Sequence, residues 1–378
     1  MPTIAPRPPR KATSHAARRH GLACLLWLAA AGHAAAQDSA AEAESAAPAD
    51  GKRTLLIVPY PITEPAVGNG VFAGPVWMRE GPAYNDGPAK TEAMGFGALW
   101  TDGGSRGMAA FDLRAWDGGR WWTTAVAADA QLRLHYDGLA PGGELDVGFG
   151  LDVVGLSLQA DRSVGDGAAT LGLRLFASDA DLSFDRGLPA ELSGSGVQSR
   201  ANGFALSYAN DTRDDVYSPT TGMQWKATGT VYATWLGGSF NAQALGLRWH
   251  RYGRGLGEGV LGVRAVLDAS RGDQPFYLRP FVGLRGVPAM RYAGESVVSM
   301  ELEHRWPVGE RWDLIAFAGA GHAQADYRGT QASASVAAGG VGVRFKARKY
   351  FGLTFGIDVA QGPDGLATYI QIGNPWAR

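Results

Sequence analysis

SVVSMELEHRW, residues 296–306, alternates strictly between apolar and polar side chains from Val298 to Glu303. Val298, Met300 and Leu302 share one parity, whereas Glu301 and Glu303 share the other. Because successive side chains of a β-strand point to opposite faces, the stretch predicts a strand with one apolar and one charged face.

The same two-residue period recurs from about residue 68 to the C-terminus. It is clear in the segments TTAVAADAQLRLHY (123–136), MQWKATGTVYATW (223–235), GVGVRFKAR (340–348) and YFGLTFGIDVA (350–360). Segments of about ten residues with this period, separated by turn residues, are typical of a transmembrane β-barrel. We therefore expect the apolar half of every segment to contact acyl chains and the charged half to line the lumen.

The predicted fold class is all-β, a transmembrane antiparallel β-barrel. Bacterial single-chain barrels have an even number of strands, so we predict 16. The additional strand comes either from a division of 168–186 near residues 178–181 or from part of 54–62. The 15 candidate segments are 68–79, 90–101, 106–117, 120–136, 143–162, 168–186, 199–210, 221–235, 239–251, 258–269, 295–306, 311–321, 334–347, 350–360 and 366–376.

A soluble β-sandwich or propeller also shows alternation and is the main structural alternative. The composition favours the barrel, since glycine makes up 54 of the 378 residues and the chain holds 12 Trp and 12 Tyr. Amphipathic aromatic side chains are enriched at membrane interfaces. No stretch after residue 36 has 18 consecutive apolar residues, so the sequence predicts no transmembrane helix.

The N-terminal region predicts export. Residues 1–36 combine five basic residues, the apolar run 21–31 and a small-residue cleavage site at Ala34–Ala36, the pattern of a signal peptide. An N-terminal anchor is the alternative. Residues 37–66 are predicted to be a flexible periplasmic leader, and 67–378 the barrel. We predict the outer membrane of a Gram-negative bacterium as the location, with outer-membrane lipids as partners.

Cleavage would remove Cys24, the only cysteine, and would leave 30 of the 35 basic residues against 36 acidic ones, a net charge of −6. Nucleic-acid-binding proteins usually carry a basic excess, so we expect no nucleic-acid partner.

The long connection 270–294 is rich in arginine and holds three prolines. A solvated surface loop is the default interpretation of such a composition. Arg285 and Gly286, however, follow directly on apolar residues, and the next strand carries Glu301 and Glu303 on its charged face. An arginine folded back into the lumen could form a forked ion pair with such a carboxylate and tether the loop inside the barrel.

Two motifs resemble those of the bacterial surface antigen superfamily, which includes barrel-assembly insertases and two-partner-secretion transporters. VGLRGVPAMRYAGE (282–295) resembles its Arg-Gly loop, and DTRDDVYSPTTG (211–222) resembles a turn motif of the family. The resemblance implies a 16-stranded barrel with an extracellular loop between strands 11 and 12, its arginine bound to lumen acids. The matching residues are Arg285 and Gly286 of the loop, and Asp211, Arg213, Asp214, Pro219 and Gly222 of a periplasmic turn.

The chain departs from the family in two places. A strand that usually carries Phe-x-Asp-x-Gly here runs from Phe317 through Gly319 to Gly321, so the expected acid is glycine. The candidate partners of Arg285 are therefore Glu301, Glu303 and Asp358. About 30 residues lie between the cleavage site and the first candidate strand, too few for the polypeptide-transport-associated (POTRA) domains of the family transporters, so we expect these domains to be absent.

The last segment, ATYIQIGNPWAR (367–378), places Ile370, Ile372 and Trp376 on one parity. Outer-membrane strands often end on an aromatic residue that the barrel-assembly machinery recognises, so we predict these three residues as an assembly signal.

Motifs for chemistry are absent from the sequence, so we predict no enzymatic activity, no cofactor and no metal. There is no Gly-x-Ser-x-Gly elbow, no His-Glu-x-x-His and no phosphate-binding loop. The acids of 211–215 lack the spacing of a calcium loop. The charged pairs Asp112–Arg114 and Arg264–Asp268 are expected to line the lumen.

The predicted function is translocation or assembly of proteins or lipids at the outer membrane, with an unidentified client. A passive diffusion porin for small solutes is the alternative, and a barrel hydrolase is a third hypothesis.

Overall fold

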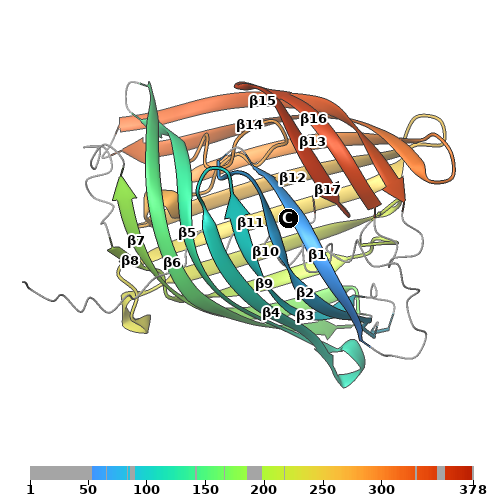
Figure 1. The fold of residues 1–378 in the computed structure, drawn as a ribbon, viewed down its shortest axis with the longest axis horizontal. Coiled ribbons are helices and arrows are strands. Elements are labelled where there is room, and N and C mark those ends of the chain that lie inside the picture. The colour runs from blue at the N-terminus through green and yellow to red at the C-terminus, as the bar shows by residue number, and fades with distance from the viewer. Residues whose placement is uncertain are drawn as a thin grey trace, which may run out of the picture.

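The computed structural model describes residues 53–64, 66–82, 84–85, 90–140, 143–165, 167–184, 198–216, 218–327, 330–346 and 354–376. The predicted signal peptide and most of the predicted leader lie outside these ranges. The described residues form β-strands joined by turns, loops and single turns of 3-10 helix (Figure 1). Among them, no helix is long and apolar enough to cross a membrane.

Seventeen strands are present in the described part of the chain, and each pairs antiparallel with its sequence neighbour except at β8. Their bounds are β1 Thr54–Glu64, β2 Gly68–Glu80, β3 Thr91–Thr101, β4 Arg106–Trp116, β5 Trp121–Ala140, β6 Gly143–Val164, β7 Ala169–Phe184, β8 Gln198–Arg200, β9 Gly203–Asp211, β10 Gly222–Tyr232, β11 Ala242–Arg254, β12 Val260–Gly272, β13 Ser296–Pro307, β14 Trp312–Tyr327, β15 Thr330–Lys346, β16 Thr354–Gly362 and β17 Gly365–Ile372.

The even strand number arises because β8 and β9 form one interrupted strand. Both pair with β7, and only Ala201 and Asn202 separate them. The sixteenth strand, in addition to the 15 candidate segments, is β1, as the alternative 54–62 proposed. The prediction that 37–66 is entirely a leader was therefore wrong for 54–64. The alternative division of 168–186 was also wrong, because β7 runs unbroken from Ala169 to Phe184.

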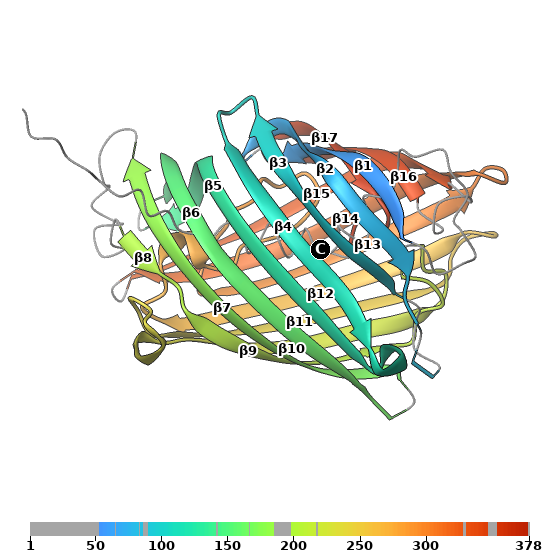
Figure 2. The same cartoon turned by 60° about the horizontal axis from the view of Figure 1, so that its bottom comes forward.

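β1 carries Pro59 and Pro61, whose nitrogens cannot donate a hydrogen bond. Proline is tolerated on an edge strand, where only one neighbour requires backbone donors. β1 pairs with β2 along its whole length, and on its other side lies β17 (Figures 1 and 2). The Ile370 amide of β17 donates to Thr63 Oγ1 of β1 at 3.3 Å. Within the described strands no backbone ladder joins the two, and we call this junction the seam.

The strands define two ends of the barrel. The turns after β2, β9 and β13, the start of β1 and the residues after β17 lie at one end, which we call the terminal end. The connection between β12 and β13 lies at the other, which we call the loop end. This connection joins strands 11 and 12 when β8 and β9 count as one, as the family resemblance implied.

The faces of β13 follow the predicted alternation. Val298, Met300 and Leu302 are 43–49% exposed on the outward face, whereas Glu301 and Glu303 are buried inside. β7 shows the same apolar outward face at Leu171, Leu173 and Leu175. The outward apolar surface is the lipid-facing belt that a transmembrane barrel requires.

The expectation that every apolar half faces lipid was wrong for 123–136. In β5, Leu132 and Leu134 are buried on the inside, whereas Arg133 and His135 are exposed on the outside. β7 switches in the same way, since its outward face changes from Leu175 to acidic residues two rungs further on. These long strands continue beyond the apolar belt, where water favours the opposite arrangement of faces.

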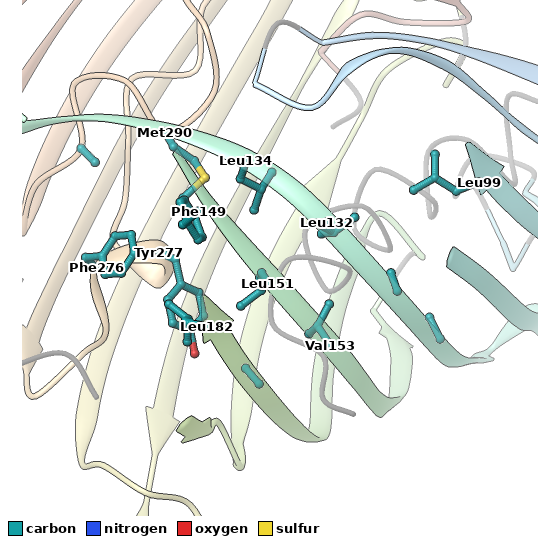
Figure 3. Packing of buried hydrophobic residues seen from close by; sticks show 14 of the residues in the cluster. Leu99, Leu132, Leu134, Phe149, Leu151, Val153, Leu182, Phe276, Tyr277 and Met290 are labelled. Atoms are coloured by element: carbon teal, nitrogen blue, oxygen red, sulfur yellow. The ribbon is translucent and has the colours of Figure 1, made fainter. Parts of the chain in front are cut away.

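The inward apolar residues of this extension build the largest core cluster (Figure 3). Phe149, Leu151 and Val153 of β6 pack there with residues of the connection between β12 and β13. That connection supplies Phe276, Tyr277 and Met290, and the ring centroids of Phe149 and Phe276 lie 5.2 Å apart. The core therefore holds the connection inside the barrel rather than above it.

Candidate functional site

The connection between β12 and β13 folds back into the lumen as a narrow hairpin. Phe281 and Ala293 form an isolated antiparallel bridge, and the Val282 amide donates to the Tyr292 carbonyl at 3.3 Å. The Arg264 guanidinium of β12 supports the hairpin through a 2.7 Å hydrogen bond to the Gly283 carbonyl. We call residues 273–295 the lumen loop, and its tip carries Arg285 and Gly286.

The structure brings Arg285 together with all three predicted acids. Its Nε and Nη2 donate to Glu301 Oε1 at 3.1 and 2.6 Å, and its Nη1 donates to Asp358 Oδ2 at 2.9 Å. Nη1 also lies 2.7 Å from Glu303 Oε2, an ion pair whose angles are not those of a hydrogen bond. One guanidinium therefore bridges β13 and β16, which a point charge such as lysine cannot do with the same fork geometry.

A second arginine completes the cluster. Arg344 of β15 binds Asp358 through both terminal nitrogens, with Nη2 at 2.8 Å from Oδ2. The cluster thus contains two arginines and three carboxylates, all buried. Burial acts against the charge of Arg285, but the carboxylates of Glu303, Glu301 and Asp358 raise the pKa of this guanidinium above its ordinary value. Arg344 was not among the sequence-predicted partners, because its parity alone did not show which acid it meets.

Phe317, in the strand segment where this chain differs from the family motif, contacts the same arginine. The Arg285 guanidinium lies 3.7 Å from the ring centroid of Phe317, a cation–π distance. At Gly319, a Cβ atom would lie 2.9 Å from Leu284 Cδ2 and 2.8 Å from the Met300 carbonyl oxygen. Glycine at this position makes room for the lumen loop, and Glu301, Glu303 and Asp358 supply the carboxylates.

Gly286 places the loop tip against β17. Its φ of +93° favours glycine, and its amide donates to Tyr369 Oη at 3.0 Å. On the other side of the seam, the Ala289 amide donates to Glu64 Oε1 of β1 at 3.0 Å. The lumen loop therefore contacts both strands that flank the seam. Neither Glu64 nor Tyr369 was predicted, and no local sequence signal pointed to them.

The residues after β17 also enter the lumen. Trp376 is 2% exposed, and its Nε1 donates to Glu301 Oε1 at 2.5 Å. The side-chain Nδ2 of Asn374 donates to Tyr252 Oη at 2.8 Å. The expected strand 366–376 was therefore wrong at its end, because β17 stops at Ile372 and Trp376 lies inside the barrel.

The two isoleucines of the predicted assembly signal lie in β17, as expected. Ile370 pairs with Ile357 and Ile372 pairs with Phe355, whereas the side chain of Ile372 lies outside the described residues. Recognition of this segment by assembly machinery stays a prediction.

The turn 211–222 lies at the terminal end and is held by hydrogen bonds between its own residues. Arg213 Nε and Nη2 donate to the two oxygens of Asp211 at 2.8 and 2.6 Å. Asp214 accepts the amides of Thr220 at 2.9 Å and Thr221 at 3.1 Å. Partial burial acts against the Asp214 carboxylate, yet a hydrogen bond from the Thr220 hydroxyl, together with these amides, holds its pKa below the usual value.

The other two residues of the turn motif are also placed. Gly222 starts β10 with a φ of +92°. The Pro219 carbonyl accepts a hydrogen bond from Arg305 of β13, which fixes the turn against the wall on which Glu301 lies.

Of the two predicted lumen pairs, Arg264 and Asp268 lie on the inward face of β12 as predicted, whereas the prediction for Asp112 and Arg114 was wrong. Asp112 and Arg114 contact each other at 2.6 Å, but they share the outward parity of β4 with the exposed Trp116. Asp268, however, accepts hydrogen bonds from Arg248 at 2.7 and 3.1 Å, whereas Arg264 donates to the Gly283 carbonyl of the lumen loop. Alternation therefore gave the wrong face for Asp112 and Arg114, and the wrong partner for Arg264 and Asp268. No group of three or more metal-ligating side chains is found in the described ranges.

With this geometry, the chain is a transmembrane β-barrel with an inward-folded arginine loop. No family model and no curated protein sequence matches it. Among solved structures, it is similar to BamA from Haemophilus ducreyi lacking POTRA domains 1–3, with a TM-score of 0.58 and 12% identity over 92% of this chain and 76% of that one.

It is also similar to CdiB from Acinetobacter baumannii, with a TM-score of 0.54, and to CdiB from Escherichia coli, with 0.56, both at 12% identity. These matches cover 85% and 87% of this chain but only 60% and 63% of the CdiB chains. These matches confirm the β-barrel fold that the resemblance implied.

Proposed function

We propose that this protein resides in the outer membrane and moves or inserts protein segments there, without enzymatic activity. The observation that carries the proposal is that one loop folds into the lumen and contacts both β1 and β17 at the seam. A junction with few hydrogen bonds exposes strand edges, and such edges pair readily with other chains. A client segment could therefore add to the seam when the lumen loop releases it.

The predicted mature chain has no cysteine, so an introduced pair reports on the seam alone. Thr63→Cys with Ile370→Cys places one thiol on each strand that flanks it. In cells that lack the native gene, we expect the oxidised pair to lose surface or secreted proteins that the wild type restores, and reduction to recover them. A control pair on β2 and β3, Val71→Cys with Trp100→Cys, joins neighbours that already share a ladder.

An unchanged surface and secreted proteome in the locked seam variant would contradict the proposal. A loss of these proteins in the oxidised β2–β3 control as well would show that an oxidised pair itself, rather than the seam, is responsible.

The porin alternative is separated by recording from planar bilayers. We expect the wild type to show low conductance, because the lumen loop and the segment containing Trp376 both lie inside the barrel. Arg285→Ala should raise the conductance, since it removes the contact between the loop tip and β13. A steady, large conductance of the wild type would instead support passive diffusion of solutes.

A further inference from the structure

A second site lies in the lumen at the terminal end, away from the lumen loop. It is a cavity of 160 Å³ formed between the inward faces of β6, β7, β9 and β10 and the turns at that end. Its lining includes Lys90, Trp122, Asp161, Ser163 and Lys226. The lining also includes Asp211 of the turn motif, but no contact between a lining residue and Arg285 is found in the described structure. The cavity is therefore separate from the lumen loop on which the proposed function rests.

Two lysines face this cavity without a carboxylate partner. Neither Lys90 nor Lys226 has an ion pair within 4 Å among the residues that the structure describes. The Lys90 ammonium lies 5.4 Å from the ring centroid of Trp122. Burial lowers the pKa of Lys90, and the carboxylates of Asp161 and Asp211 act in the opposite direction.

The two acids of the lining have other partners. Asp211 is held by both nitrogens of Arg213 and by Gln224 Nε2 at 3.1 Å. Asp161 accepts a 2.7 Å hydrogen bond from Gln159. Once Asp211 is neutralised by Arg213, the cavity carries two ammonium groups against the single charge of Asp161.

A third cation lies further along β7, beyond the lining residues. Arg174 follows the lining residue Thr170 on the inward parity of β7, and its buried Nε has no hydrogen-bond partner in the described structure. Neutral donors complete the wall, namely the hydroxyls of Ser163, Thr170 and Ser207 and the amide of Gln224. Buried cations together with hydroxyl donors form a favourable environment for a compact anion with several acceptor oxygens.

We propose that this cavity binds a phosphate group, held by Lys90 and Lys226. A phosphate offers more acceptor oxygens than a carboxylate, which suits the number of donors on the wall, and lysine binds phosphate as a point charge. The lining turns place the cavity at the terminal end. The phosphate can therefore belong to a soluble compound that enters there or to a lipid headgroup.

The test uses the full mature chain, purified in detergent micelles, with inorganic phosphate and glycerol 3-phosphate as probes. Isothermal titration at constant ionic strength should show saturable binding that chloride does not reproduce. Lys226→Met should weaken it by about tenfold or more, as expected for loss of one buried charge partner. Lys226→Arg should retain most of it. Arg106→Gln removes an exposed cation outside the cavity and should leave the binding unchanged.

Mass spectrometry of co-purified lipid distinguishes the two sources. Phospholipid bound to the wild type and lost from Lys226→Met, without binding of the soluble probes, would assign the site to a lipid headgroup. Binding of the soluble probes alone would assign it to a solute. If Lys226→Met does not fold, Lys90→Gln and Lys226→Arg carry the comparison. The proposal fails if neither probe nor lipid binds the wild type, or if Lys226→Met and Arg106→Gln behave alike.

Discussion

Trp376 and Arg285 bind the same carboxylate oxygen, Oε1 of Glu301, from two ends of the fold. The indole Nε1 lies 2.5 Å from it and the guanidinium Nη2 lies 2.6 Å from it. The C-terminal segment and the lumen loop therefore share one anchor on β13. Residues that share a partner are expected to have coupled energies.

We first predict that changes at these two residues are not additive. Trp376→Phe removes only the indole N–H donor. Arg285→Lys keeps the charge but removes the guanidinium, which binds Glu301 and Asp358 at the same time. The double variant should differ from the sum of the single ones by about 0.5–3 kcal/mol in the free energy of unfolding. Urea titration of the protein in micelles measures this difference.

Arg248→Lys is the matched control for that cycle, since Arg248 binds Asp268 elsewhere in the lumen. Its combination with Trp376→Phe should be additive. Additivity of Trp376→Phe with Arg285→Lys as well would contradict the shared anchor.

We next predict that Gly286→Ala destabilises the barrel more than Gly257→Ala. Both glycines have positive φ, +93° and +63°, so each alanine incurs a backbone cost of about 1–3 kcal/mol. Only at residue 286 would the new Cβ lie 3.2 Å from the Cβ atoms of Ala338 and Ala360, whereas at 257 nothing lies within 4 Å. Equal losses of unfolding free energy would show that the loop tip is not tightly packed.

Our third prediction concerns Gly319, where the absence of a side chain leaves space for the lumen loop. Gly319→Asp, which restores the acid expected from the family, should displace the lumen loop because Leu284 occupies the space. Limited proteolysis of the loop should therefore become faster than in the wild type. Adding Leu284→Ala should restore part of the protection, since the Met300 carbonyl oxygen still lies 2.8 Å from the new Cβ. No restoration at all would argue against direct contact between residues 284 and 319.

The hydrogen bonds of Asp214, in the turn at the terminal end, predict that the stability of the folded protein decreases in acid. The pKa of Asp214 is lower in the folded chain than its ordinary value of 3.8, so its ionised form contributes stability above that pH. This contribution is lost as the pH falls below 3.8 through the lower folded value. Asp214→Asn should therefore reduce stability near neutral pH and show a smaller loss in acid. Thermal unfolding across this pH range checks the sign, and parallel curves for both proteins would refute it.

The sequence by itself determined the class of fold and the arginine site apart from Arg344. A two-residue period in segments such as 296–306 requires strands, because side chains alternate only in extended backbone. The same parity placed Glu301, Glu303 and Asp358 on charged faces, and the Arg-Gly motif identified the cation that they bind. These features are local, so no knowledge of the barrel was needed.

Only the tertiary structure decided which face is outside and which distant residues meet. In β5 the alternation predicted a strand, but its length beyond the apolar belt placed Leu132 and Leu134 inside. The contacts of the seam are also non-local, since Glu64 meets Ala289 across 225 residues and Trp376 meets Glu301 across 75. Such pairs depend on the curvature of the whole sheet, which brings the first and last strands together around one lumen. This curvature produces no periodic pattern in the sequence.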